Sequence, residues 1–130
     1  MKLKKKALLV DDDDISLYIH KRLLKRINII DQFDKANNGV EALNLYQHYM
    51  KSDTGYPDVI LLDINMPVMN GFEFLEAFNL LNFRSKQNTV IIVMSSSRNQ
   101  NDIARAQLLG VKHFLTKPLD ESGLASILVN

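Results

Sequence analysis

Short runs of apolar and β-branched residues recur along the chain and give it an alternating pattern. Four runs are clear, at Ala7–Val10, Val59–Leu62, Val90–Met94 and Val111–Leu115, and a weaker one lies at Phe33–Ala36. Strands that are buried on both faces, as in a parallel sheet, have this continuous apolar character. The runs therefore predict five strands of one parallel sheet.

The segment after the first apolar run has the period of an amphipathic helix. Apolar residues recur at every fourth position, at Ile15, Ile19, Leu23 and Ile27, and the basic residues lie largely on other faces. The pattern predicts a helix with its apolar face along these four residues. Either Asp13 or Asp14 is well placed to cap its N-terminus, because aspartate is favoured there and its charge suits the helix dipole.

Two further helices are marked by an asparagine that precedes a glutamate by three positions. Asn38 opens one of them, which extends to about Lys51, and Asn70 opens the other. This spacing is the signature of an N-terminal cap in which both side chains bond to the backbone of the first turn.

The last two helices are shorter. One begins at Asn101 or Asp102 and ends near Gly110, a residue suited to the left-handed conformation that follows a helix. Asp120 begins a short fifth helix. Five strand-then-helix units predict an α/β fold, a doubly wound five-stranded parallel sheet with five helices, in a single domain over residues 1–130.

Composition narrows the possibilities without selecting one function. The 130 residues are 46% hydrophobic and 24% charged, as in an ordinary soluble domain, and the net charge of +1 favours no particular partner. The absence of cysteine excludes disulfides, thiolate metal sites and thiol nucleophiles. The basic start MKLKKK precedes too short an apolar run for a signal peptide or a membrane span, so we expect a cytoplasmic protein.

Polar residues follow four of the predicted strands. They are Asp11–Asp14, Asp63, Ser95–Ser97 and Thr116–Pro118. In a doubly wound sheet the carboxyl ends of the strands meet at one edge, where ligands bind. Four adjacent carboxylates repel one another, by about 4 kcal/mol for a pair about 4 Å apart at an effective dielectric of about 20. The repulsion raises the question of what keeps such a cluster at the end of a strand.

Four motifs, taken together and in order, resemble one known family. The motifs are LLVDD (8–12), DVILLDINMPVMNG (58–71), VMSSS (93–97) and GVKHFLTKP (110–118). They resemble the receiver domain of two-component response regulators, of the stand-alone chemotaxis type, and the likeness covers essentially the whole chain. The resemblance implies a flavodoxin-like sheet with strand order 2-1-3-4-5. Only about ten residues follow the start of the fifth helix near Asp120, so we expect no output domain if the sequence is the full gene product.

The resemblance also implies a function, that of a single-domain response regulator. Asp63 would accept a phosphoryl group from a sensor histidine kinase or a histidine phosphotransfer protein, in a reaction that requires Mg²⁺, with Mn²⁺ as an alternative. Asp12 and Asp63 would ligate the ion through their carboxylates, Asp11 largely through water, and Asn65 through its backbone carbonyl. Oxygen donors of this kind are the ones that Mg²⁺ prefers.

Three further residues receive roles from the resemblance. Lys117, before a cis peptide bond to Pro118, would neutralise phosphoryl charge, and Ser95 would donate a hydroxyl hydrogen bond. Ser95 and Phe114 would form the switch that changes the surface of the fourth helix, fifth strand and fifth helix on phosphorylation.

Two alternatives remain open at this point. One is a phosphatase-like enzyme with an aspartate nucleophile, although such an enzyme would want a second acid where Asn65 stands. The other is a receiver-like module that binds partners without being phosphorylated. The receiver interpretation predicts a phosphoacceptor that assists its own phosphorylation and dephosphorylation but is not an enzyme. It would act on an unknown downstream protein, as a monomer or a phosphorylation-dependent dimer, without binding nucleic acid or membrane.

Overall fold

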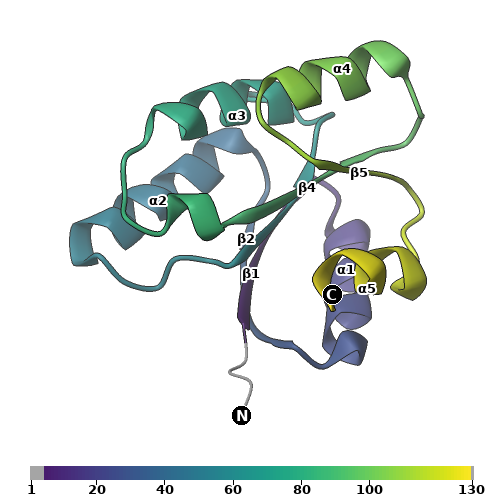
Figure 1. Cartoon of the computed structure of the whole chain (residues 1–130), viewed down its shortest axis with the longest axis horizontal. Helices are drawn as coiled ribbons and strands as arrows, with labels where there is room; N and C mark the ends of the chain where they lie inside the picture. Colours follow the sequence, from purple (N-terminus) through teal and green to yellow (C-terminus); the bar gives the residue numbers. More distant parts are fainter. Residues whose placement is uncertain (1–4, 130) are drawn as a thin grey trace.

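The computed structural model describes residues 5–129. Five parallel strands form one sheet in the order β2-β1-β3-β4-β5, which confirms the predicted strand order (Figure 1). The strands are β1 (Lys5–Val10), β2 (Ile30–Ala36), β3 (Val59–Asp63), β4 (Val90–Ser95) and β5 (His113–Thr116). The central strand β3 is buried along its whole length, as its unbroken apolar sequence predicts.

Helices cover both faces of the sheet. They are α1 (Asp14–Ile27), α2 (Gly39–Ser52), α3 (Gly71–Leu80), α4 (Gln100–Leu108) and α5 (Glu121–Leu128), with a short 3-10 helix, η1, at Lys86–Asn88. Figure 1 shows α1 and α5 side by side on one face, and α2, α3 and α4 on the other. None of the helices in residues 5–129 is long and apolar enough to span a lipid bilayer.

Alternating side chains of the central strands divide the core into two layers. Leu8 and Leu62 pack in the cluster that includes α2 and α3, whereas Leu9 and Leu61 pack in the cluster that includes α1 and α5. Neighbouring residues of a strand point to opposite faces, so a strand with helices on both sides must be apolar at every position.

The buried face of α1 differs from the predicted one. Its buried residues are Leu17, His20 and Leu24, whereas Ile15 is 70% and Ile19 47% exposed. Residues spaced by four advance by about 40° beyond a full turn at each step, so a row of four spans about 120° of the helix surface. Only the C-terminal part of the predicted row, from Leu23 onward, reaches the core.

The helix starts follow the capping residues, with one correction. Asp13, Asn38, Asn70 and Asp120 cap α1, α2, α3 and α5 as predicted. The predicted start of α4 at Asn101 or Asp102 is wrong, because the side chain of Asn99 accepts hydrogen bonds from both of their backbone N–H groups. The cap is therefore Asn99, and the helix begins at Gln100.

The start of β5 is also later than predicted. Gly110 has a positive φ of 92°, and the N–H of Val111 still bonds to the carbonyl of Ala106 at 3.0 Å. These residues complete the C-terminal end of α4, as the glycine suggested. The strand consequently begins at His113 instead of Val111.

Candidate functional site

The predicted site residues lie at the carboxyl edge of the sheet. Asp11 follows β1, Asp63 ends β3, Ser95 ends β4 and Lys117 follows β5. The neighbouring strand ends are joined by backbone hydrogen bonds, including one of 2.7 Å from the N–H of Lys117 to the carbonyl of Ser95. Residues that are far apart in sequence are thus brought to one edge by strand order and register alone.

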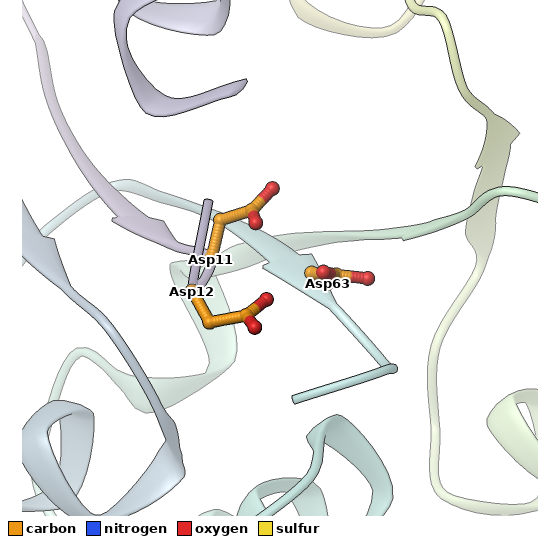
Figure 2. A group of neighbouring side chains, drawn as sticks. All are labelled: Asp11, Asp12 and Asp63. Carbon is orange, nitrogen blue, oxygen red and sulfur yellow. The ribbon is translucent and has the colours of Figure 1, made fainter. Parts of the chain in front are cut away.

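Three carboxylates form the centre of the site. Asp11, Asp12 and Asp63 each offer an oxygen that lies within 4.8 Å of the others. Figure 2 shows the three side chains together at the ends of β1 and β3. Asp11 and Asp63 are buried, at 1% and 4% exposure, while Asp12 is exposed. The site is therefore a concentrated negative charge that opens to solvent on the side of Asp12.

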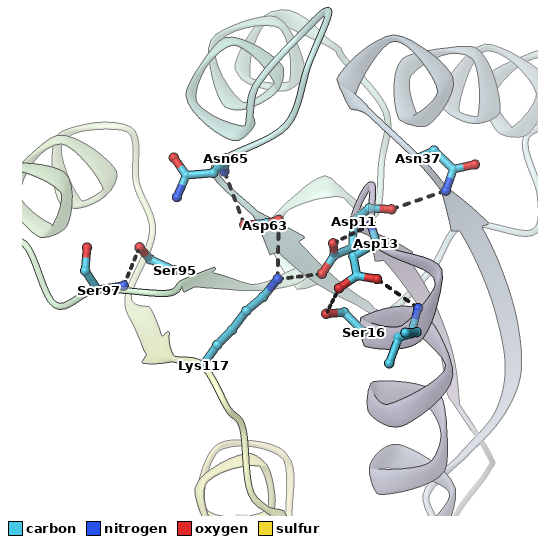
Figure 3. A network of polar contacts seen from close by, with 10 residues as sticks. Asp11, Asp13, Ser16, Asn37, Asp63, Asn65, Ser95, Ser97 and Lys117 are labelled. Carbon is cyan, nitrogen blue, oxygen red and sulfur yellow. Dashed lines mark hydrogen bonds and ion pairs between the residues drawn. The ribbon is translucent and has the colours of Figure 1, made fainter.

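Lys117 is the cation that contacts this cluster. Its Nζ lies 2.8 Å from Oδ2 of Asp11 and 3.4 Å from Oδ2 of Asp63 (Figure 3). Burial lowers the pKa of Lys117, but Asp11 and Asp63 outweigh this effect, so the net pKa is raised and the ammonium is retained. One ammonium against three carboxylates leaves an excess of two negative charges, which suits a divalent cation.

The buried carboxyl of Asp63 has competing influences. Burial is the largest and raises its pKa, and the nearby Asp11 acts in the same direction. The backbone N–H of Asn65, 3.2 Å from Oδ1, and the ammonium of Lys117 favour the carboxylate but do not cancel the rise. The two oxygens of Asp63 have different partners: Oδ1 accepts a hydrogen bond from the backbone N–H of Asn65, and Oδ2 accepts one from Lys117.

The four adjacent aspartates divide into separate roles. The carboxylate of Asp13 accepts a hydrogen bond from the N–H of Ile15 at 3.0 Å and one from the hydroxyl of Ser16 at 3.2 Å, so it caps α1. Asp11 accepts a bond from the N–H of Asp13 at 3.0 Å, and its backbone carbonyl accepts one from Asn37 at 3.3 Å. These contacts fix the loop so that Asp11 and Asp12 lie in the cluster.

The predicted switch residues are less closely tied to the cluster. Ser95 is fully buried, and its Oγ accepts a hydrogen bond from the N–H of Ser97 at 3.2 Å (Figure 3). Within residues 5–129 Ser95 makes no side-chain hydrogen bond to Asp63 or Lys117. Phe114 is half-buried and packs against the cluster on the α2–α3 face.

The peptide bond between Lys117 and Pro118 is cis, as the resemblance implies. Sequence reasoning missed the hydrogen bond from Asn37 to the carbonyl of Asp11 and the electrostatic influence of the site on His20. His20 is buried in α1, and its pKa is lowered by burial and by Lys117, against the opposing effect of Asp11. No local pattern distinguishes these two residues, because their position near the site depends on how α1 and the β2–α2 loop pack.

A doubly wound sheet with buried carboxylates and a lysine at its carboxyl edge is the arrangement that the resemblance to receiver domains implies. Residues 7–129 match the family described as the response regulator receiver domain, and the chain belongs to this family. This result confirms the resemblance on which the functional prediction depends. Receiver domains bind Mg²⁺ at such an acidic site and interact with histidine kinases or phosphotransfer proteins.

Individual relatives agree with this assignment. The chain is 34% identical over 122 residues to two-component response regulator 24 of Arabidopsis thaliana, covering 94% of this chain and 80% of the relative. It is 33% identical over 128 residues to hybrid signal transduction histidine kinase B of Dictyostelium discoideum, of which it spans only 6%.

Solved structures show the same likeness in three dimensions. A two-component response regulator from Cytophaga hutchinsonii has a TM-score of 0.85 and 27% identity, with 95% of this chain and 94% of that chain covered. The Mn²⁺-bound form of response regulator Rcp1 has a TM-score of 0.75 and 25% identity, with 95% and 88% covered.

Proposed function

We propose that this protein acts in the cytoplasm as a response regulator whose Asp63 accepts a phosphoryl group from a histidine kinase or a histidine phosphotransfer protein. One observation carries the proposal: Lys117, which is 54 residues from Asp63 in sequence, contacts both Asp63 and Asp11. A buried carboxylate beside an ammonium and further acids has the groups that phosphoryl transfer requires.

The donor set fits a divalent cation. Asp11, Asp12 and Asp63 present hard carboxylate oxygens close together, and the backbone carbonyl of Asn65 would complete the set on the protein side. Mg²⁺ would be the natural ion and Mn²⁺ an alternative, in keeping with the Mn²⁺-bound form of the similar Rcp1. Such an ion supplies positive charge that offsets the charge of the phosphoryl oxygens.

The chain's own residues account for the remaining chemistry. An oxygen of Asp63 forms the new bond to phosphorus as the bond between phosphorus and the histidine nitrogen of the donor breaks, and the imidazole leaves with the bonding electron pair. Asn65 holds the other oxygen in place through its backbone N–H. Lys117 offsets the added charge, and the hydroxyl of Ser95 donates a hydrogen bond to a phosphoryl oxygen.

The output would follow from a change in the surface formed by α4, β5 and α5. Movement of Ser95 toward the phosphoryl group vacates space for the ring of Phe114, which has no hydroxyl to satisfy when it turns inward. The half-buried position of Phe114 supports easy access to that inward state. The altered surface would bind an unidentified downstream protein or a second copy of the chain.

Contact with the phosphoryl donor would use the exposed start of α1. Ile15 and Tyr18 are 70% and 61% exposed, and Ile15 follows the acidic loop by only a few residues. An apolar surface next to the acceptor suits the helical bundle of a kinase, which must bring its phosphohistidine to Asp63.

Acetyl phosphate with Mg²⁺ tests the proposal without a known kinase. We expect about one phosphoryl group per chain on the wild type and none on Asp63→Asn. Asp31→Asn, which removes an exposed acid on β2, is the control and should be labelled like the wild type. Continuous turnover of acetyl phosphate would instead indicate a phosphatase. Absence of both labelling and turnover would indicate a module that only binds partners.

A further inference from the structure

A second candidate site lies at the amino edge of the sheet, away from the acidic cluster. A groove of about 910 Å³ is bordered by the end of α3, the segment that leads through η1 to β4, and the turn between α4 and β5. Val90 and His113, the first residues of β4 and β5, line it. The carboxyl ends of the same strands lead to Ser95 and Lys117, so the groove and the acidic cluster lie at opposite edges.

The groove carries positive charge. Arg84, Lys86 and Lys112 line it together with His113, and no aspartate or glutamate is among the described residues of the lining. Within residues 5–129, the side chains of Arg84 and Lys112 have no hydrogen-bond or ion-pair partner. Two exposed cations in one groove, without a counter-charge, form a surface that attracts a negatively charged partner.

The helix ends at the groove do not cancel this charge. The C-terminal ends of α3 and α4 both reach it, and their free carbonyls would otherwise present partial negative charge. The Nζ of Lys86 bonds to the carbonyls of Asn79 and Leu81, each at 2.7 Å, and the side-chain amide of Asn79 bonds to the carbonyl of Leu109 at 3.0 Å. Lys86 is thus used for capping, which leaves Arg84 and Lys112 available.

Apolar side chains line the groove together with these cations. Leu80 is 86% exposed, and Leu81 and Leu109 are half-buried. A small anion would use the cations but leave Leu80 in water, whereas a polypeptide with both acidic and apolar side chains would cover both.

We propose that this groove binds an acidic segment of a partner protein that carries interleaved apolar side chains. Because the groove lies at the opposite edge from Asp63, such a segment would leave the phosphoryl-accepting site open to its donor. The inference goes beyond the proposed function and does not depend on phosphorylation.

A short synthetic peptide that interleaves glutamate and leucine is a direct probe. We expect the backbone amide resonances of residues 81–91 and of Lys112 to shift when this peptide is added, while those around Asp63 do not. The double variant Arg84→Glu/Lys112→Glu should weaken binding by about tenfold or more. Lys86 is left unchanged in this variant, because its capping bonds support the fold.

A matched control separates a specific site from general charge. Lys25→Glu/Lys51→Glu changes the net charge by the same amount, at two exposed positions on α1 and α2. It should bind the probe nearly as well as the wild type, with only the small loss that the change in net charge causes. Equal weakening in both double variants would overturn the proposal, as would equal binding of a peptide with lysine in place of each glutamate. Resonance shifts elsewhere, no shifts at all, or equally strong shifts with inorganic pyrophosphate would also overturn it.

Discussion

Tyr46 and Tyr49 show how burial of the same side chain can have opposite consequences. Both are buried residues of α2, and their ring centroids lie 5.1 Å apart. The hydroxyl of Tyr49 donates a hydrogen bond to the carboxylate of Asp34. The hydroxyl of Tyr46 is fully buried and has no hydrogen-bond partner among the described residues. An unpaired buried hydroxyl costs folding free energy, whereas a paired one stabilises the fold.

We therefore expect the two phenylalanine variants to differ in sign. Tyr46→Phe should raise the free energy of unfolding by about 1 kcal/mol, and Tyr49→Phe should lower it by about 1 kcal/mol or more, because it leaves the Asp34 carboxylate without that donor. Urea denaturation of both variants measures the difference. A loss of stability in Tyr46→Phe equal to that in Tyr49→Phe would show that the hydroxyl of Tyr46 is hydrogen-bonded.

At the residue scale, the sequence was sufficient to predict which groups meet but not how they bond. Asp11, Asp63 and Lys117 follow apolar strands, and parallel strand order brings their positions together. Strand order does not determine that Lys117 lies closer to Asp11 than to Asp63, because that difference is one of side-chain geometry. The roles of Ser95 and Phe114 stay predictions, since both describe a phosphorylated state.

At the scale of an element, the loop from β3 to α3 depends on a glycine at the start of the helix. A Cβ on Gly71 would lie 2.7 Å from the Cα of Ile64 and 2.8 Å from the carbonyl oxygen of Asp63. Gly39, at the start of α2, is also crowded, but there the nearest atoms belong to the flexible side chain of Met69. These backbone atoms cannot move aside without moving Asp63.

We expect Gly71→Ala to lower the free energy of unfolding by about 1–3 kcal/mol and to slow labelling of Asp63 by acetyl phosphate. Gly39→Ala is the matched control and should cost less, with labelling close to that of the wild type, because Met69 can change its rotamer. Thermal unfolding and labelling rates measure both effects. Equal labelling rates for the two variants would contradict the coupling of Gly71 to the acceptor.

Strands and helices were predictable because each type has a distinct sequence pattern. The errors lie where several neighbouring residues fit the same pattern equally well. Buried strands such as β3 are continuous apolar runs, and Asn38 and Asn70 are recognisable caps. Asn99, two positions before the predicted start of α4, is an equally good cap, and sequence alone did not select between them. The face of α1 could not be read because its apolar residues surround much of the helix.

At the scale of the whole molecule, the carboxylate cluster at the carboxyl edge of the sheet makes stability depend on pH. The pKa of Asp63 is raised in the folded protein, chiefly by burial. Its contribution to stability is thus fully present below the pKa of an unfolded aspartate, about 4, and is lost as the pH rises through the raised folded value.

We expect Asp63→Asn to remove this dependence in the absence of divalent cations. The melting temperature of the wild type should therefore fall relative to that of the variant as the pH rises from about 4 toward neutrality. Thermal unfolding in a chelating buffer across this pH range measures the difference between the two proteins. A wild type that gains stability relative to Asp63→Asn over the same range would show that its carboxylate is stabilised in the fold.

Addition of Mg²⁺ should offset the loss of folding stability that the carboxylates of this cluster cause. A ligand that binds only the folded state stabilises it by about 2.7 kcal/mol at a concentration about 100 times its dissociation constant. Asp12→Asn removes one carboxylate of the cluster and should greatly reduce this gain. Asp13→Asn removes the same charge from the next residue but keeps an N-cap for α1, so it should retain most of the gain.

The comparison of Asp12→Asn with Asp13→Asn tests whether the four adjacent aspartates form a defined cation site or only attract cations through their charge. Both variants lower the negative charge of the loop equally, so a general attraction of Mg²⁺ to an acidic surface would reduce the gain in melting temperature equally in both. Coordination by the cluster requires a larger loss in Asp12→Asn, because Asp13 uses both of its oxygens to hold Ile15 and Ser16. Equal losses would mean that the carboxylates attract the cation without forming a defined site beside Asp63.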